Sequence, residues 1–207
     1  MRRRYPSRPP RLLATLNTLL LAALLIAPTV RADVVFTVDS TADQLDSDVS
    51  DGFCATAAGT CTLRAAIMQA NRSSGAGATI ILPAGTYVLT RPATTIDGDD
   101  SGDLNLTTPI AGNTAINIFG AGAGITVIDA NQIDRVLNVH ASRTAFVSGV
   151  SMRNGFTGPT RYGGALANSG ALTLVGVSIA ASSARVGGGV YNSVPGELTM
   201  QDCIVST

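Results

Sequence analysis

Residues 164–178 read GALANSGALTLVGVS, and residues 188–204 read GGVYNSVPGELTMQDCI. The segment GALANS at 164–169 returns as GGVYNS at 188–193, and the triplet LTL at 172–174 returns as LTM at 198–200. Further upstream, GVSM at 149–152 returns as GVSI at 176–179. Such nearly constant intervals are typical of solenoids, in which each repeat forms one coil that packs only against its neighbours. The sequence therefore predicts a stack of similar coils.

Each predicted coil is made of short strands. Apolar residues alternate with other residues in short runs, such as Ile116 with Ile118 and Leu137 with Val139, and a period of two indicates strands. Glycine and asparagine recur between the runs, where tight corners need positive φ. We therefore expect an all-β fold, a parallel β-helix that occupies residues 79–207, with three strands and three corners in each coil.

One helix is predicted ahead of the coils. Apolar side chains recur there at intervals of three and four residues, which gives residues 62–71 one apolar helical face. Residues 73–75 are the expected stop, after an N-cap threonine. A solenoid needs its first coil covered, because its strand edges and apolar interior would otherwise meet water. The helix is therefore assigned as the N-terminal cap of the coils, with Thr62, Leu63, Arg64, Ala66 and Ile67 as its defining residues.

Residues 1–32 are predicted to be a signal peptide. A basic start precedes the apolar run at 19–27, and the small residues Val30 and Ala32 stand before Asp33. The apolar run is shorter than the roughly 20 residues of a membrane span, although an uncleaved anchor is the alternative. We expect cleavage before Asp33 and a secreted or cell-surface location, with no membrane span in the mature chain.

Cleavage would leave a negatively charged mature chain, although the full sequence has a net charge of zero. The full chain has 14 basic and 14 acidic residues, but six arginines lie within residues 1–32 and every acid lies beyond them. The mature chain therefore carries a net charge of −6 and has no lysine. Nucleic acids and anionic membrane surfaces select proteins with a basic footprint. Composition thus argues against a nucleic-acid partner, and polysaccharides or cell-surface components are the expected partners.

The stretch CTLRAAI at 61–67 resembles the signature of the CSLREA domain, which stands at the start of bacterial secreted or surface β-helix proteins. Other features similar to that family follow its order along residues 33–129: an Asp-rich approach at 43–51, Cys54, LPAGTY at 82–87, GDLNL at 102–106, GAG at 120–122 and TVID at 126–129. The resemblance implies a right-handed parallel β-helix behind a CSLREA-like capping region, here residues 33–78. It implies no catalytic residues.

Ala65 departs from the signature, which has glutamate at that position. A glutamate three residues after an N-cap Ser or Thr completes a capping box. Its loss should cost about 0.5–1 kcal/mol of helix-end stability. The sequence therefore predicts that Ala65→Glu stabilises the domain.

The three cysteines are expected to have different roles. Cys54 and Cys61 stand on either side of a glycine-containing loop, and in an exported protein such a pair is expected to form a disulfide. Cys203 aligns with Val150 and Val177 of the preceding coils, which favours a small buried core residue. A reactive thiol is the alternative for Cys203, with no histidine nearby in sequence to support it.

Acidic residues cluster in two stretches, 43–51 and 97–103. Calcium prefers several oxygen ligands on a flexible loop, which makes the second stretch a weak candidate calcium site. Neither stretch has the EF-hand spacing, so solvated surface loops are the preferred interpretation and no cofactor is expected. The candidate calcium ligands are Asp97, Asp99, Asp100 and Asp103.

Two classes of function remain open. The first is a non-catalytic secreted or cell-surface protein whose coils present a surface for binding, adhesion or structure. The second is a polysaccharide lyase, hydrolase or epimerase on a pectate-lyase-like β-helix, which is an argument from fold analogy. Sugar hydrolysis needs two carboxylates on one cleft, but only Glu197 and Asp202 follow Asp134. A cationic base for a lyase could come from Arg135, Arg143, Arg153 or Arg161.

The last predicted coil has no cap. The runs at 198–200 and 203–205 are not followed by a corner or a polar segment. An uncovered coil exposes a strand edge that invites pairing. The sequence therefore predicts a chain truncated at its C-terminal side and prone to end-to-end self-association.

Overall fold

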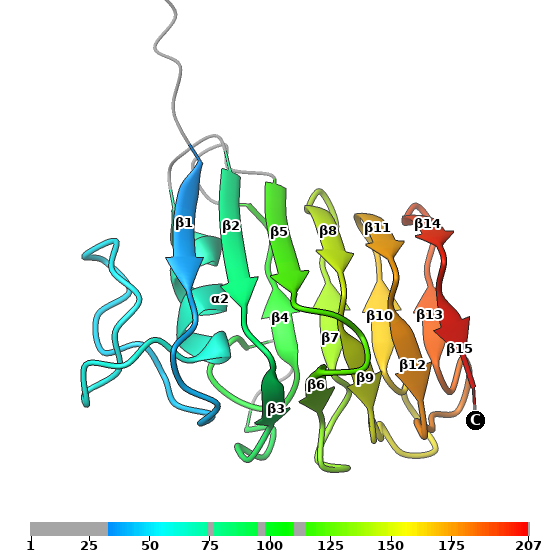
Figure 1. The fold of residues 1–207 in the computed structure, drawn as a ribbon. Coiled ribbons are helices and arrows are strands. Elements are labelled where there is room, and N and C mark those ends of the chain that lie inside the picture. The colour runs from blue at the N-terminus through cyan, green and yellow to red at the C-terminus, as the bar shows by residue number, and fades with distance from the viewer. Residues whose placement is uncertain (1–32, 74–76, 95–97, 110–114, 207) are drawn as a thin grey trace, which may run out of the picture. The chain divides into compact units, whose positions relative to one another are not determined.

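A computed structural model describes residues 33–73, 77–94, 98–109 and 115–206 of the chain. The predicted signal peptide, residues 1–32, lies outside these described residues. The described residues are mostly β-structure, with strands in three sheets and a single α-helix (Figure 1). Within them, no helix has the length and apolar character that crossing a membrane requires.

All strand pairs in the three sheets are parallel. The six-stranded sheet contains, in spatial order, β1 (Val34–Thr37), β2 (Gly77–Leu82), β5 (Ala115–Gly120), β8 (Thr144–Ser148), β11 (Ala171–Val175) and β14 (Glu197–Gln201). The five-stranded sheet contains β3 (Gly85–Val88), β6 (Thr126–Asp129), β9 (Ser151–Arg153), β12 (Ser178–Ala180) and β15 (Ile204–Val205). The four-stranded sheet contains β4 (Leu104–Leu106), β7 (Leu137–Val139), β10 (Leu166–Asn168) and β13 (Val190–Asn192).

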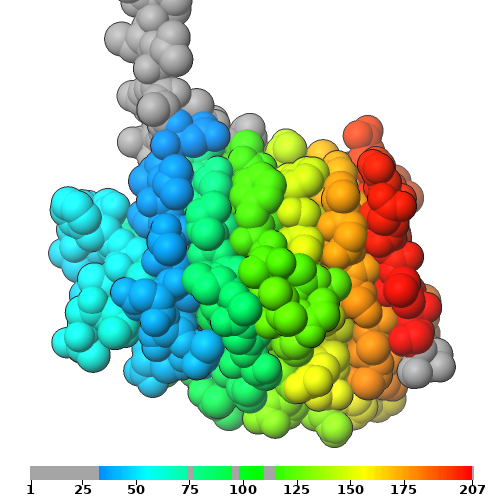
Figure 2. Space-filling view, viewed as in Figure 1, coloured from blue at the N-terminus to red at the C-terminus, as the bar shows by residue number. Residues whose placement is uncertain are grey.

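From β2 onward the chain visits the six-, five- and four-stranded sheets in that order and then begins again. We call one such passage a circuit. Figure 2 shows the successive circuits as adjacent bands of colour. Leu166 pairs with Val190, Leu172 with Leu198, and Ser151 with Ser178. These partners hold equivalent positions in the repeated segments of the sequence, so the repeats coincide with the parallel register.

The core is formed by side chains that alternate along each strand, because neighbouring residues of a strand point to opposite faces. Each sheet contributes rows of aliphatic residues from successive circuits. Their members are at most 2% exposed, for example Ile80, Ile118, Val147 and Leu174 in the six-stranded sheet, Ile128, Met152 and Ile179 in the five-stranded sheet, and Leu104, Leu137 and Leu166 in the four-stranded sheet. Each circuit therefore buries its apolar side chains against the circuits on either side.

Helix α2 (Leu63–Arg72) lies where the apolar spacing predicts a helix and ends one residue later than expected. Thr62 is its N-cap, and the Thr62 Oγ1 accepts a hydrogen bond from the backbone N–H of Ala65 at 3.1 Å. The helix contacts β1, β2 and β4, beside which Figure 1 places it. It therefore packs against the first strands of the six- and four-stranded sheets.

Burial argues against the expectation for Ala65, because α2 is buried on more than its apolar face. Ala65 has no exposed surface, and the polar side chains of Arg64, Gln69 and Asn71 are also buried. A glutamate at position 65 would therefore place a carboxylate inside the protein, where an unpaired charge is unfavourable. The capping-box argument holds for a helix end that meets water, and this end does not.

Candidate functional site

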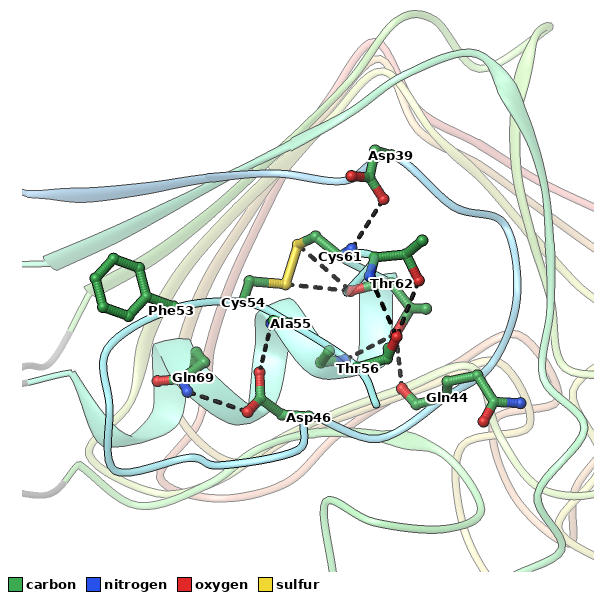
Figure 3. Close-up of a disulfide and its surroundings, with 12 residues drawn as sticks. Asp39, Gln44, Asp46, Phe53, Cys54, Ala55, Thr56, Cys61, Thr62 and Gln69 are labelled. Atoms are coloured by element: carbon green, nitrogen blue, oxygen red, sulfur yellow. Dashed lines mark hydrogen bonds between the residues drawn. A yellow bond between two sulfur atoms is a disulfide. The ribbon is translucent and has the colours of Figure 1, made fainter. Parts of the chain in front are cut away.

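The expected disulfide joins Cys54 and Cys61, whose Cα atoms are 5.1 Å apart. Figure 3 shows it closing a loop beside α2. Asp39 accepts a hydrogen bond from the Cys61 N–H at 2.8 Å. Asp46 accepts one from the Ala55 N–H and another from the side chain of Gln69, at 3.1 and 3.2 Å. Carboxylates on the approach to α2 therefore attach this loop to the protein.

Arg64 is a buried connection between two acidic stretches. Its guanidinium is fully buried and pairs with Asp43, with Nε 2.5 Å from Oδ1. The same guanidinium donates to the carbonyl oxygens of Gly102 and Asp103 at 2.8 and 3.2 Å. Asp43 also accepts from the backbone N–H of Thr90 at 2.8 Å. Arg64 therefore links α2 to both loops, which gives this helix residue a structural role.

The candidate calcium ligands do not form a common site among the described residues, and Asp97 lies outside those residues. Asp99 forms an ion pair with Arg72, with 2.6 Å between Oδ2 and Nη1. Asp100 accepts a hydrogen bond from Ser101, and Asp103 is only 2% exposed. The described part of the chain holds no cluster of three or more His, Cys, Asp or Glu side chains that could bind a metal ion. The expectation of a solvated loop is therefore wrong for Asp103.

A groove of about 440 Å³ lies on the outer face of the four-stranded sheet. Its floor is formed by the middle residues of three neighbouring strands, Asn138, Ala167 and Tyr191, which are partners in the parallel register. Residues that directly follow these strands line one side, namely His140, Ser169 and Ser193. Successive circuits therefore each supply a floor residue and a wall residue.

Residues that precede the strands line the other side of the groove. Arg135 stands just before β7, and Arg161 and Tyr162 belong to the connection between β9 and β10. Tyr162 and Tyr191 stack with their ring centroids 4.7 Å apart and their planes 20° apart. The guanidinium carbon of Arg185 lies 5.8 Å from the Tyr162 ring centroid. The groove thus combines an aromatic pair with charged and polar side chains.

The polar groups of the groove form hydrogen bonds along the stack of circuits. Asn138 donates from Nδ2 to Oδ1 of Asn105, its partner in β4, at 2.9 Å. His140 Nε2 lies 3.1 Å from Asn138 Nδ2 and 3.2 Å from Asn105 Oδ1. The hydroxyls of Ser169 and Ser193 are 2.8 Å apart. These interactions hold amides, hydroxyls and an imidazole in place beside the groove.

Two buried carboxylates lie next to the groove's arginines. Asp103 Oδ2 is 2.9 Å from Nε of Arg135, and Asp134 Oδ1 is 2.9 Å from Nη1 of Arg161. Burial raises the pKa of Asp103 to about 6, and the negative charge of Asp134 adds to this rise. The nearby Arg135 and Arg161 and the hydrogen bond from Asn105 oppose it. Neither carboxylate lines the groove, and none of the described lining residues is Asp or Glu.

The four arginines named as candidate bases separate into two groups. Arg135 and Arg161 line the groove. Arg153 forms an ion pair with Asp129 at 2.8 Å in the five-stranded sheet. Arg143 is buried, donates from Nε to the carbonyl oxygen of Thr107 at 2.8 Å, and has a pKa that burial lowers to about 10. Only the first two therefore lie where a ligand in the groove could reach them.

Sequence reasoning did not identify the groove, although one signal for its floor was present. The repeat that aligns GALANS with GGVYNS places Ala167 opposite Tyr191, as in the structure. Tyr162 lies within the same repeat, because RYGG at 161–164 aligns with RVGG at 185–188 and Tyr162 pairs with Val186 in a parallel bridge. Comparisons of the chain with protein-family models, curated proteins and solved structures found no match.

Proposed function

We propose that the chain is an exported, non-catalytic carbohydrate-binding protein, and that the groove on its four-stranded sheet is the binding site. In this proposal it acts in adhesion or recognition at a cell surface or outside the cell. The disulfide between Cys54 and Cys61 agrees with an oxidising compartment. The apolar and small-residue pattern before Asp33 supports export.

The proposed architecture is a right-handed parallel β-helix with a CSLREA-like cap. The repeated passage through three parallel sheets supports a helical course of the chain. The cap is supported by the residues of the CTLRAAI stretch, because Arg64 and Thr62 of that stretch attach α2 to the segments around it. Arg64 pairs with Asp43, and the Thr62 hydroxyl donates to the carbonyl oxygen of Gln44 at 2.6 Å.

The observation that carries the proposed function is the stacked Tyr162–Tyr191 pair beside a row of polar side chains. A sugar ring has an apolar face of C–H groups and a rim of hydroxyls. An aromatic side chain can cover that face, while its own hydroxyl remains available for hydrogen bonds. Asn138, Ser169 and Ser193 supply donors and acceptors for the hydroxyl rim. The groove therefore offers both kinds of surface that a sugar presents.

Binding is favoured over catalysis by the position of the acids. Glycoside hydrolysis needs two carboxyl groups on one cleft. Asp103 and Asp134 are at most 3% exposed and face arginines. A polysaccharide lyase, hydrolase or epimerase remains the alternative proposal, and it predicts that the chain shortens or modifies the polysaccharide it binds.

Binding of the full chain to immobilised neutral and acidic polysaccharides tests the proposal. We expect retention on at least one polysaccharide, without change in its chain length or composition. Tyr191→Ala should weaken this binding by about tenfold, because it removes one ring of the aromatic pair. Phe53→Ala is the matched control, since Phe53 is 72% exposed and lies outside the groove. Retention on none of the polysaccharides, or equal retention of Tyr191→Ala and the unchanged chain, would contradict the proposal.

A further inference from the structure

Arg135 is a buried cation whose hydrogen-bonding capacity is not used by the described residues. Its side chain is 8% exposed and it lines the groove. Its Nε is 2.9 Å from Asp103 Oδ2, but the N–H is not aimed at that oxygen, so the contact is an ion pair without a hydrogen bond. The next carboxylate, Asp134, is 4.0 Å from the same nitrogen. Buried guanidinium N–H groups normally have acceptors.

Nε itself is closed to solvent, so a ligand would reach the two terminal nitrogens of Arg135, to which the described residues offer no hydrogen bond. We propose that the groove binds a carbohydrate that carries a carboxylate, a uronic-acid oligosaccharide, and that Arg135 binds the carboxylate. This inference rests on the proposed function, because it names the chemical class of the ligand for the same groove. The guanidinium is planar, and its paired N–H groups match the two oxygens of a carboxylate.

The charges around the groove agree with an anionic ligand. Two of the eight arginines beyond residue 32 line the groove, although the net charge of that part of the chain is −6. Arg161 is the second of them, with a side chain that is 34% exposed. The groove itself contains no described Asp or Glu side chain. A carboxylate in the groove would therefore meet two guanidinium groups and no carboxylate among the described lining residues, since Asp103 and Asp134 contact these arginines from outside the groove.

The aromatic pair points to a sugar as the carrier of this carboxylate. Arg135 and Tyr191 line the same groove, together with the amide of Asn138 on its floor. A small inorganic anion would use the arginine alone and leave the stacked rings without a role. A uronic acid presents a carboxylate and an apolar ring face on one residue. It therefore matches both features at once.

Calorimetric titration of the full chain tests this inference with two probes of equal length. One is a tetramer of galacturonic acid, and the other is the same tetramer with every carboxyl group methyl-esterified. We expect the acid to bind about tenfold or more tightly than the ester, because only the acid forms charge-assisted hydrogen bonds. Equal binding of both probes would overturn the inference and leave the proposed function standing. Binding of neither probe, together with no retention on any polysaccharide, would overturn both.

Variants test whether Arg135 causes the preference for the acid over the ester. Arg135→Gln should bind the acid no more tightly than the ester, whereas Arg153→Gln removes the same charge outside the groove and should keep the preference. Arg135→Lys retains the charge beside Asp103 without the planar fork, and should bind the acid more weakly than the unchanged chain. If Arg135→Gln is not folded, as shown by the lack of a cooperative unfolding transition, the Arg135→Lys variant and the two probes still test whether Arg135 binds the carboxylate. A sulfated oligosaccharide that displaces the acid at lower concentration would overturn the carboxylate assignment.

Discussion

Asp103 belongs to an acidic stretch whose composition indicates a solvated loop, but its own surroundings are those of a buried residue. The side chain is buried, its carboxylate faces Arg135, and Asp134 and Arg161 lie close enough to influence its ionisation. Asn105 donates to Asp103 Oδ1 at 2.7 Å, and Arg64 donates to the backbone carbonyl. Among acids of one loop, Asp99 remains near the surface, while Asp103 belongs to the interior beside the groove.

The pKa of about 6 at Asp103 predicts a stability that depends on pH. An aspartate in the unfolded chain has a pKa of about 3.9. Between the two values the folded protein binds more protons than the unfolded chain, so the free energy of unfolding falls as pH rises through about 4 to 6. Asp103→Asn removes this titration. The melting temperature of the native chain should therefore fall relative to that of Asp103→Asn as pH rises.

Thermal unfolding of both chains across this pH range provides the measurement. Other carboxylates titrate in the two chains alike, so the comparison isolates Asp103. A difference in melting temperature that stays constant from about pH 4 to pH 7, on either side of the raised pKa, would contradict the assignment.

Ala65 gives a second prediction at the scale of single residues. Because Ala65 is fully buried, Ala65→Glu should destabilise the protein by about 2 kcal/mol or more through overpacking and an unpaired buried charge. Ala57→Glu is the matched control, since Ala57 is exposed in the disulfide loop. Chemical denaturation measures both changes. Equal midpoints for Ala65→Glu and the unchanged chain would show that the site accepts a carboxylate.

At the scale of elements, the corners between strands limit what the stack tolerates. Gly120 ends β5 and lies against Gly149, the corner that follows β8 in the next circuit. A Cβ atom at Gly120 would overlap the Gly149 carbonyl oxygen. Gly149 itself has a φ of +63°, which side chains rarely permit. The spacing between these two circuits therefore depends on glycine at both corners.

Gly120→Ala is expected to lower the free energy of unfolding by about 2 kcal/mol or more, because the backbone must move to admit the methyl group. Gly124→Ala, in the same connection, meets no atom within 4 Å and should leave stability almost unchanged. Melting temperatures of the two variants test the difference. Similar melting temperatures for both would mean that neighbouring circuits can move apart at this corner.

The strands, their register and the helix were predictable from the sequence, whereas the surroundings of particular side chains were not. The segments 149–152, 164–169 and 172–174 each recur one circuit later, and these repeats predict the parallel register. The reason is that every circuit must place its apolar rows over those of the previous circuit. Helix α2 follows from its apolar spacing and its N-cap threonine. The groove was not predicted, although Arg161 and Tyr162 lie in a segment that repeats, because the repeat does not show which outward side chains of neighbouring circuits enclose a hollow. Nor was the burial of Asp103, since local composition does not reveal a partner as distant in the sequence as Arg135.

At the scale of the whole molecule, the two ends of the described fold differ. Helix α2 packs against β1, β2 and β4. The final circuit, with β14 and β15, has only one neighbour among the described strands. Its inward positions are correspondingly more exposed, since Met200 is 39% exposed while its partner Leu174 has no exposed surface. The described chain thus presents a free strand edge and partly exposed apolar residues at one end.

We predict that a chain consisting of residues 1–207 self-associates through this final circuit. An exposed strand edge with apolar neighbours favours pairing with another chain, and a charge on an inward position opposes it. Met200→Lys should therefore reduce the concentration dependence of the molar mass measured by light scattering. Thr173→Lys adds the same charge on the outward face of β11, which is paired on both sides, with β8 and β14, and should leave the association unchanged. A monomer at every concentration in the unchanged chain would rule out this end as an interface, and equal effects of the two lysines would indicate general charge repulsion instead.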